Sequence, residues 1–376
     1  MKHSGKTLLL GALVSAISQG ANAANDFDRN GNAQHAVFVM TNDADENAVI
    51  AFERTPYGTL QSSRRYETGG RGSGGTVDPL GSQGSLTLSE DGSLLFAANA
   101  GSGTLSVFRV FGSRLALIDR ANSGGSEPNA VAQHGKLVYV LNTAGSSSVV
   151  GFRSFEGKLV RIPDSQRFLS GNFANSASLA FSPEGRFLVV TERATNSIDV
   201  FRVQPDGRLS TITVNPSAGP GAFSATFAPN GTVIVSETGT GGATSATSSY
   251  TIAPDGKLLP VSVSLPTLGA ANCWNVVTPD GRFVYTSNAG TGSIAGFEIG
   301  ARGALRPIGS TIVGMNPAGS VNLDIAISAD GRFLYSLNAG TGAVGMFGID
   351  RDGSLVNLGT QSGLPAAAGL NGIAAN

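Results

Sequence analysis

The chain has 376 residues and a formal net charge of −1, and 52 of its residues are glycine, about twice the usual share of roughly 7%. A near-neutral chain lacks the basic face that phosphate contacts need, so we expect no nucleic-acid partner. The single cysteine excludes an internal disulfide and any CxxC module. Only His35 and His134 lie beyond residue 23, which disfavours histidine-based catalytic and zinc sites.

The first 23 residues have the order of a secretory signal. Lys2 and Lys6 precede an apolar run over residues 8–17, and Ala21-Asn22-Ala23 ends the segment. The apolar run is about half of the ~20 residues that a membrane span needs. We therefore expect cleavage near Ala23, a periplasmic or secreted protein without a membrane span, and one domain over residues 24–376.

A unit of about 50 residues repeats along the rest of the chain. Each unit has an apolar run, an Asp-Gly-type turn, a β-branched and aromatic run, an Asn-x-Gly-type turn and an aromatic anchor. The seven anchors are Phe52, Phe108, Phe152, Phe201, Tyr250, Phe297 and Phe347. Because such turns join antiparallel strands, four short strands per unit are expected. The sequence therefore predicts an all-β, seven-bladed β-propeller with four antiparallel strands per blade.

The two ends of the chain complement each other. The first unit begins near His35 without an opening strand, whereas residues 370–376 resemble the beginning of a unit that does not continue. We expect the C-terminal strand to complete blade 1 and close the ring, which removes exposed sheet edges.

Two glycine-rich stretches break the repeat. Residues 69–84 lengthen the spacing between the first two anchors to 56 and contain Gln83, and residues 239–245 lengthen the turn after Glu237. We expect both on one rim of the propeller, where long loops often bind ligands. A flexible spacer is the alternative.

The end of the second strand carries an asparagine in five blades and a glutamate in two. The positions are Asn42, Asn99, Asn142, Glu192, Glu237, Asn288 and Asn338. Two carboxylates in neighbouring blades predict an acid/base pair, and Arg193 could hold a substrate carboxylate. Alternatively, the glutamates take over the turn-bonding role of asparagine, with Arg193 as a salt-bridge partner.

The starts of the first strands supply further candidates. Trp274 could stack on a ring-shaped ligand or be buried between blades, and Asn129 and Asp324 stand at comparable positions. No cofactor is required, although glutamate, Asp324 and asparagine oxygens leave a calcium or magnesium site open. Cys273 lacks a nearby histidine base, so we expect it to be buried and inert.

The Tyr-x-x-Asn tetrads at 139–142, 285–288 and 335–338, two of them after Ser/Thr-x-Asp-Gly-Arg, resemble the YVTN-type repeat. The chain from about residue 35 to 376 resembles the seven-bladed lactonase family, which includes phosphogluconolactonase and carboxymuconate cyclase. The resemblance implies a substrate at the mouth of the central channel, handled by His, Arg and Glu near the starts of inner strands. The corresponding residues here include no histidine: Ser85, Asn129, Ser178, Ser224, Trp274 and Asp324.

Two functions remain open at this point. The first is an exported, monomeric, lactonase-like protein that hydrolyses or isomerises a small lactone or carboxylated ligand. In that hypothesis Glu237 is the acid/base, Glu192 its partner and Arg193 the anchor, and Trp274, Asp324, Asn129 and Gln83 bind the ligand. The alternative is a non-catalytic binding or interaction propeller of the periplasm or cell exterior.

Overall fold

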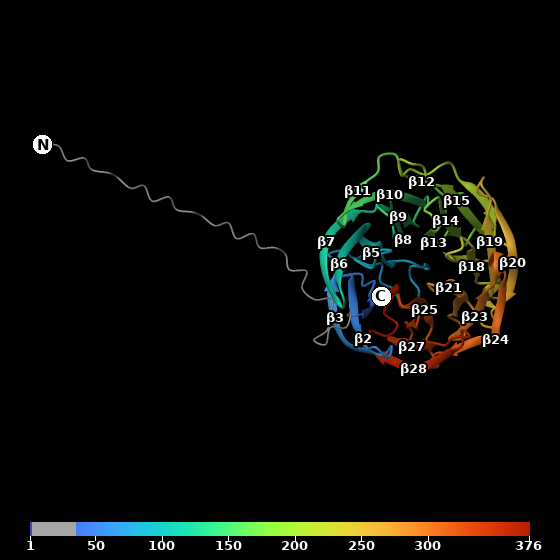
Figure 1. Cartoon of the computed structure of the whole chain (residues 1–376). Coiled ribbons are helices and arrows are strands. Elements are labelled where there is room, and N and C mark those ends of the chain that lie inside the picture. Colours follow the sequence, from blue (N-terminus) through green and yellow to red (C-terminus); the bar gives the residue numbers. More distant parts are fainter. Residues whose placement is uncertain (2–34) are drawn as a thin grey trace.

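The computed structural model describes Met1 and residues 35–376, so the predicted signal segment lies outside the described residues. Seven antiparallel sheets stand around a ring, as Figure 1 shows. Six of them have four strands, and one has a short fifth strand. No helix in the described part of the chain is long and apolar enough to cross a membrane. The expected seven-bladed β-propeller is confirmed.

The blades follow one another along the chain, and their strands are listed here from the first strand outward. Blade 1 contains β29 (Ile373–Ala375), β1 (His35–Met40), β2 (Ala48–Arg54) and β3 (Leu60–Glu67). Blade 2 contains β4 (Leu86–Leu88), β5 (Leu94–Asn99), β6 (Thr104–Phe111) and β7 (Arg114–Asn122). Blade 3 contains β8 (Pro128–His134), β9 (Leu137–Asn142), β10 (Ser148–Phe155) and β11 (Lys158–Arg161), and β12 (Arg167–Phe168) also pairs with β10.

The remaining four blades have the same layout. Blade 4 contains β13 (Ser176–Phe181), β14 (Phe187–Glu192), β15 (Ser197–Arg202) and β16 (Thr213–Pro216). Blade 5 contains β17 (Ala222–Phe227), β18 (Val233–Glu237), β19 (Ala246–Ile252) and β20 (Leu258–Pro266). Blade 6 contains β21 (Asn272–Val277), β22 (Phe283–Asn288), β23 (Ser293–Ile299) and β24 (Leu305–Met315), and blade 7 contains β25 (Asn322–Ile327), β26 (Phe333–Asn338), β27 (Ala343–Ile349) and β28 (Leu355–Ser362). Three short 3₁₀ turns are η1 (Ala100–Ser102), η2 (Thr240–Gly242) and η3 (Ala301–Gly303).

The ring closes as expected. β29 pairs antiparallel with β1, with Val37 opposite Ala375 and Val39 opposite Ile373. In Figure 1 the C-terminus accordingly lies among the first strands, between the blue first blade and the red last blade. The first strands of neighbouring blades contact one another around the ring, so they line a central channel.

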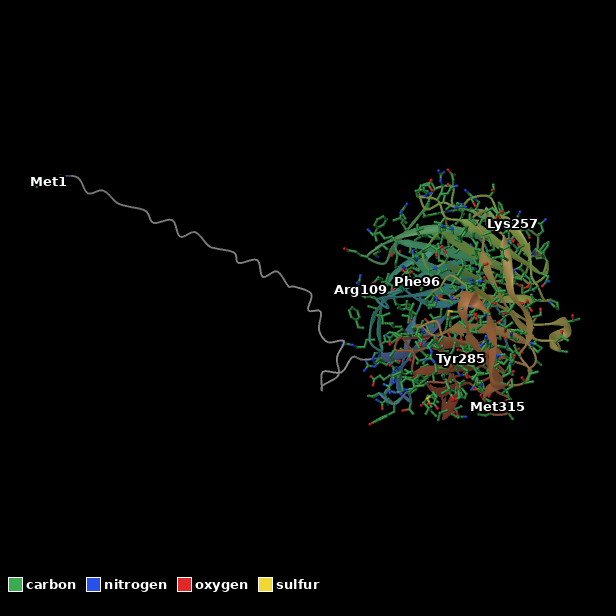
Figure 2. The ribbon with its side chains drawn as sticks, turned by 45° about the vertical axis from the view of Figure 1, so that its right-hand side comes forward. Met1, Phe96, Arg109, Lys257, Tyr285 and Met315 are labelled. Atoms are coloured by element: carbon green, nitrogen blue, oxygen red, sulfur yellow. The ribbon has the colours of Figure 1, made fainter. Side chains whose placement is uncertain are left out.

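The hydrophobic core lies between the blades. The aromatic anchors are buried, and Figure 2 shows Phe96 and Tyr285 inside the ring, with Lys257 and Met315 at its outside. The tyrosines of the repeat also tie blades together, because Tyr139, Tyr285 and Tyr335 donate to the carbonyls of Gly207, Gly353 and Gly58 in the next blade. Each such bond contributes about 1 kcal/mol.

A shared irregularity shapes the mouth of the channel. The first strands of blades 3 to 7 each shift register at their beginning. The shift leaves one extra residue per blade opposite the second strand, which is typical of a β-bulge. In blade 5 this region contains Phe223, and in blade 6 it contains Cys273.

Candidate functional site

The second half of the 69–84 insertion lies across the channel rather than along the rim. The Gln83 amide donates to the Ala177 carbonyl of blade 4, and its side chain bonds the backbone of Asn275 in blade 6 at 2.7 and 3.2 Å. The Ser82 hydroxyl donates to the Asn129 carbonyl of blade 3 at 2.7 Å. These bonds connect blades on different sides of the ring, so residues 78–84 plug the mouth, and the flexible-spacer interpretation of this part is wrong.

Arg193 follows β14 directly and extends to this plug. Its guanidinium stacks over the Phe223 ring with 5.0 Å between Cζ and the ring centroid. A Cβ on Gly81 would lie 2.9 Å from a terminal nitrogen of this guanidinium, so glycine permits the close approach. The Nε of Arg193 is buried without a hydrogen-bond partner, and no carboxylate of the described chain forms an ion pair with Arg193, Glu192 included.

Two carboxyls with raised pKa values lie at the plugged mouth, and Asp78 is the one that interacts with this guanidinium. Burial raises the pKa of Asp78, in the plug, to about 7, although the Arg193 charge and hydrogen bonds from Gly81 and Asn371 act in the opposite direction. Burial also raises the pKa of Asp324, at the start of β25, to about 7, against hydrogen bonds from the Ile373 and Ile325 amides. A carboxyl group with a pKa near 7 can exchange a proton at neutral pH.

Trp274 and Cys273 belong to the packed wall of the channel. Trp274 is 1% exposed, lies edge-on to Phe223 with 5.0 Å between ring centroids, and donates its indole N–H to the Ser82 carbonyl at 2.8 Å. Of the two alternatives for Trp274, stacking on a ligand or burial, this geometry favours burial. Burial raises the pKa of the Cys273 thiol well above its usual range, which keeps the thiol protonated and unreactive.

Glu192 and Glu237 end β14 and β18, and their carboxylates bond the connections that arrive from the preceding blades. Glu192 accepts hydrogen bonds from the amide and hydroxyl of Ser170, both at 2.7 Å, and from the Thr195 hydroxyl. Asn99 and Asn288 accept equivalent bonds from Thr68 and Thr267 at 2.7 and 2.8 Å. The end of the second strand thus holds the segment that arrives from the preceding blade, whether the residue is Asn or Glu.

Glu237 is held in the same way in blade 5. It accepts bonds from the Gly219 amide at 2.9 Å, from Ser248 at 2.6 Å and from Ser264 at 2.8 Å. It also lines a hollow of about 570 Å³. The walls of this hollow are Pro220, Ala243, Thr244, Ser245, Ala246, Ser264, Pro266, Leu268 and Gly269, so the 239–245 insertion contributes to it. Glu237 itself has no exposed surface.

The structure therefore divides the predicted site residues. Arg193, Trp274, Asp324 and Gln83 lie at the plugged mouth, whereas Glu192 and Glu237 end second strands and bond the connections between blades. Asn129 is buried, donates to the Ser176 carbonyl at 2.9 Å, and leaves its Oδ1 without a partner. No group of three His, Cys, Asp or Glu side chains among the described residues is arranged to hold a metal ion.

Sequence reasoning missed Asp78, Phe223 and Asn371 as members of the mouth. The Asn371 amide donates to Asp78 at 3.2 Å and its oxygen accepts from Ser85 at 3.0 Å. Asp78 is the only acidic residue in the 69–84 insertion, and this was the available signal.

The family model described as "Lactonase, 7-bladed beta-propeller" matches residues 163–245 and 275–367, a little under half of the chain. No curated protein matches the sequence. The periplasmic gluconolactonase of Pseudomonas aeruginosa is similar in structure, with a TM-score of 0.67 and 18% identity over 90% of this chain and 99% of that one. A candidate 6-phosphogluconolactonase of Bacteroides uniformis has a TM-score of 0.68 and 18% identity over the same shares.

Proteins described by other functions also have this fold. A hypothetical selenium-binding protein of Sulfolobus tokodaii has a TM-score of 0.65 and 12% identity over 90% of this chain and 92% of that one. At such identities, likeness between structures shows the fold alone. Together with the family model and the seven closed blades, it confirms the resemblance of this chain to the seven-bladed β-propeller lactonase family.

Proposed function

We propose that the protein is an exported lactonase-like hydrolase that acts on a small lactone or carboxylated ligand at the plugged mouth of the channel. One observation carries this proposal: the unpaired Arg193 guanidinium lies near Asp78, a carboxyl group whose pKa is about 7. An unpaired guanidinium favours an anion or a developing oxyanion. A carboxyl that is partly ionised at neutral pH suits a general base.

The proposed reaction is addition of water to the ester carbonyl. The Asp78 carboxylate takes a proton from water as the water oxygen bonds to the carbonyl carbon, and Arg193 stabilises the negative charge that forms on the carbonyl oxygen. The ring C–O bond then breaks, and the leaving oxygen takes the proton from Asp78. The product is a hydroxy acid, whose new carboxylate Arg193 can also hold.

Glu237 is less suited than Asp78 to act as the general base. Four donors already occupy its carboxylate oxygens, from Ser217, Gly219, Ser248 and Ser264, and the side chain has no exposed surface. Replacing Glu237 therefore tests the sequence-based hypothesis separately from Asp78. Export is supported by the order of residues 1–23 and by the periplasmic gluconolactonase among the similar structures.

The second candidate function is a binding propeller without catalysis. It is favoured by the plug, because hydrogen bonds from Ser82 and Gln83 to three other blades narrow access to the channel. A closed mouth suits slow ligand exchange or recognition of a partner at the rim.

A lactone panel with a pH-stat readout tests both functions. The panel contains δ-gluconolactone and a butenolide that carries a carboxylate, each with and without a chelator. Asp78→Asn should lower kcat by about 10²- to 10⁴-fold, Arg193→Gln should raise KM most for the carboxylated lactone, and the exposed Asp352→Asn is the matched control. Loss of turnover in Glu237→Gln but not in Asp78→Asn would move the base to Glu237. Binding without turnover by the unmodified protein would leave the binding function.

The pH profile gives an independent check. Because Asp78 must be ionised to act, kcat/KM should rise as pH passes through about 7, and the rise should be absent from the residual activity of Asp78→Asn. A profile that falls over this range would contradict the general-base role.

A further inference from the structure

Blade 4 contains two carboxyl groups in direct contact. Asp199 on β15 hydrogen-bonds Glu192 at the end of β14, and both side chains are fully buried. The Ser170 amide lies 2.7 Å from Glu192 Oε1 and 3.3 Å from Asp199 Oδ2, so one N–H serves both groups. Since two adjacent carboxylates repel each other, a hydrogen bond between them requires one proton.

No positive charge in the described chain compensates the pair. The side chains that bond it are Ser170 and Thr195. Arg193, next to Glu192, stacks on Phe223, and Arg202, three residues after Asp199, stacks on Phe187 and donates to the Pro254 carbonyl. Arg167, which precedes Ser170, donates to the carbonyls of Leu209, Asp164 and Gln166. A shared proton is therefore the way in which this site remains neutral enough to be buried.

The distribution of hydrogen bonds indicates which group carries the proton. Glu192 receives three bonds from Ser170 and Thr195, and together with the bond from Asp199 they outweigh burial and hold the pKa of Glu192 below its usual value. Burial and the Glu192 charge raise the pKa of Asp199 to about 9, and its Oδ1 accepts no hydrogen bond. Asp199 is thus the donor and Glu192 the acceptor.

This arrangement is specific to blade 4. The strand pairings place Asp199 opposite Val190, two residues before Glu192. The residues at the same register in the other blades are Val49, Ser106, Val150, Ser248, Ala295 and Gly345. None of them is acidic, so the repeat itself does not require a second carboxyl.

The pair holds the segment that leads to Arg193. Ser170 begins the connection from blade 3 to blade 4, and the same connection accepts bonds at Asn175 and Ala174 from the amides of Arg193 and Ala194. Phe173 and Asn175 both have positive φ, at 56° and 50°, which costs energy unless the surroundings hold the backbone there. Ser170 is the point at which the pair restrains this connection.

We infer that Glu192 and Asp199 share one proton, and that this proton positions Arg193 by keeping the 169–175 connection against the end of β14. When the proton leaves, two adjacent buried carboxylates repel, the bond between them is lost, and the connection loosens. Both residues are positioning residues, because neither lies in the channel. The inference deepens the proposed function only in so far as Arg193 is the ligand anchor.

The proton can be counted without any ligand. Below the pKa of about 9 the folded protein holds the Asp199 proton, whereas the unfolded chain releases it above ~4. The free energy of unfolding should therefore fall as pH rises from 5 to 8. The slope of this fall should correspond to nearly one more proton in the unmodified protein than in Asp199→Asn. Asparagine keeps a donor to Glu192, and Asp78 and Asp324 contribute equally to both proteins. Ser248→Asn in blade 5 is the matched control and should leave the slope unchanged.

The single tryptophan reports on Arg193. Trp274 contacts the Phe223 ring on which the guanidinium stacks, so its emission should change with a midpoint near pH 9 in the unmodified protein and in Asp78→Asn, but not in Asp199→Asn. The KM for the carboxylated lactone should rise over the same range only where the emission changes. If Asp199→Asn does not fold, Glu192→Gln removes the second acid in the same way.

The outcomes separate the claims. Equal pH slopes for the unmodified protein and Asp199→Asn would overturn proton sharing. A changed slope with unchanged Trp274 emission would overturn the positioning of Arg193. Absence of lactone turnover would remove the proposed function, but the slope and emission experiments would still decide this inference.

Discussion

Blades 4 and 5 solve the same local problem with different chemistry. Both end their second strand in a glutamate that holds the segment arriving from the preceding blade. In blade 4 the neighbouring residue is Asp199, and in blade 5 it is Ser248, whose hydroxyl donates to Glu237 at 2.6 Å. Blade 5 therefore stabilises one carboxylate with neutral donors, whereas blade 4 needs a proton to do so. Two junctions with the same glutamate should thus respond differently to pH and to substitution.

The asparagine blades show what the glutamates replace. In blade 2, Asn99 donates from its amide to Thr104 and Ser106 and accepts from Thr68. A neutral side chain that both donates and accepts can complete this junction alone. A carboxylate only accepts, so each glutamate needs additional donors, and blades 4 and 5 differ in where those donors come from.

Removing either glutamate should give the largest loss of stability, and the loss should differ between blades 4 and 5. Glu237→Ala leaves the Gly219 amide and the Ser248 and Ser264 hydroxyls without their acceptor, at an expected loss of about 3 kcal/mol. Glu192→Ala should cost roughly half as much, because Asp199 can then ionise and accept the Ser170 amide. Urea unfolding at pH 5 measures both.

The control for this pair is Glu184→Ala. Glu184 is an exposed hairpin residue whose Oε1 lies 4.0 Å from Arg186 Nε, so the loss of stability should be small. An equal or larger loss in blade 4 than in blade 5 would show that Asp199 does not substitute for Glu192.

The glycines of the two connections should differ as well. A Cβ on Gly219 would lie 2.1 Å from Glu237 Oε2 and 2.5 Å from Ser264 Oγ, whereas a Cβ on Gly171 would meet the Thr195 methyl at 2.7 Å and Glu192 Oε2 at 3.7 Å. The exposed Thr195 can move, but the buried Glu237 cannot. Gly219→Ala should cost about 2 kcal/mol and Gly171→Ala less than ~1 kcal/mol. Thermal melts of both variants measure this, and equal shifts would contradict the tighter packing of blade 5.

Most of the fold could be predicted from the sequence because the repeat is local. The turn and anchor positions recur in every blade, and the unpaired C-terminal segment indicated how the ring closes; β29 beside β1 confirmed it. The plug could not be predicted, since Ser82 and Gln83 bond residues 47 to 192 positions away along the chain. Nothing in the local sequence of a glycine-rich insertion specifies such contacts.

The candidate site was predictable only in part. Strand position correctly made Glu192 and Glu237 equivalent, but whether that position faces a ligand or a neighbouring segment depends on Ser170 and Gly219, which arrive from the preceding blade. The importance of Asp78 comes from its long-range interactions with Arg193 and Asn371, which no spacing reveals. Asp199 was accessible in principle, because a hairpin that pairs Glu192 with Ser197 places residue 199 beside residue 190.

Converting blade 4 to the arrangement of blade 5 should change the free energy of unfolding least at pH 5. Above pH 5 the change should be the most informative one. In Asp199→Ser the hydroxyl can donate to Glu192 as Ser248 does to Glu237, but the shorter side chain loses some packing contact. The net change in the free energy of unfolding at pH 5 should therefore be less than ~1 kcal/mol. Because folding of the unmodified protein takes up the Asp199 proton, its stability falls as pH rises toward about 9. That decline amounts to up to about 1.4 kcal/mol per pH unit, and the variant lacks it. Asp199→Ser should therefore become the more stable protein before pH 8, as melting temperatures measured from pH 5 to 8.5 would show. Parallel curves would mean that blades 4 and 5 hold their glutamates in the same way.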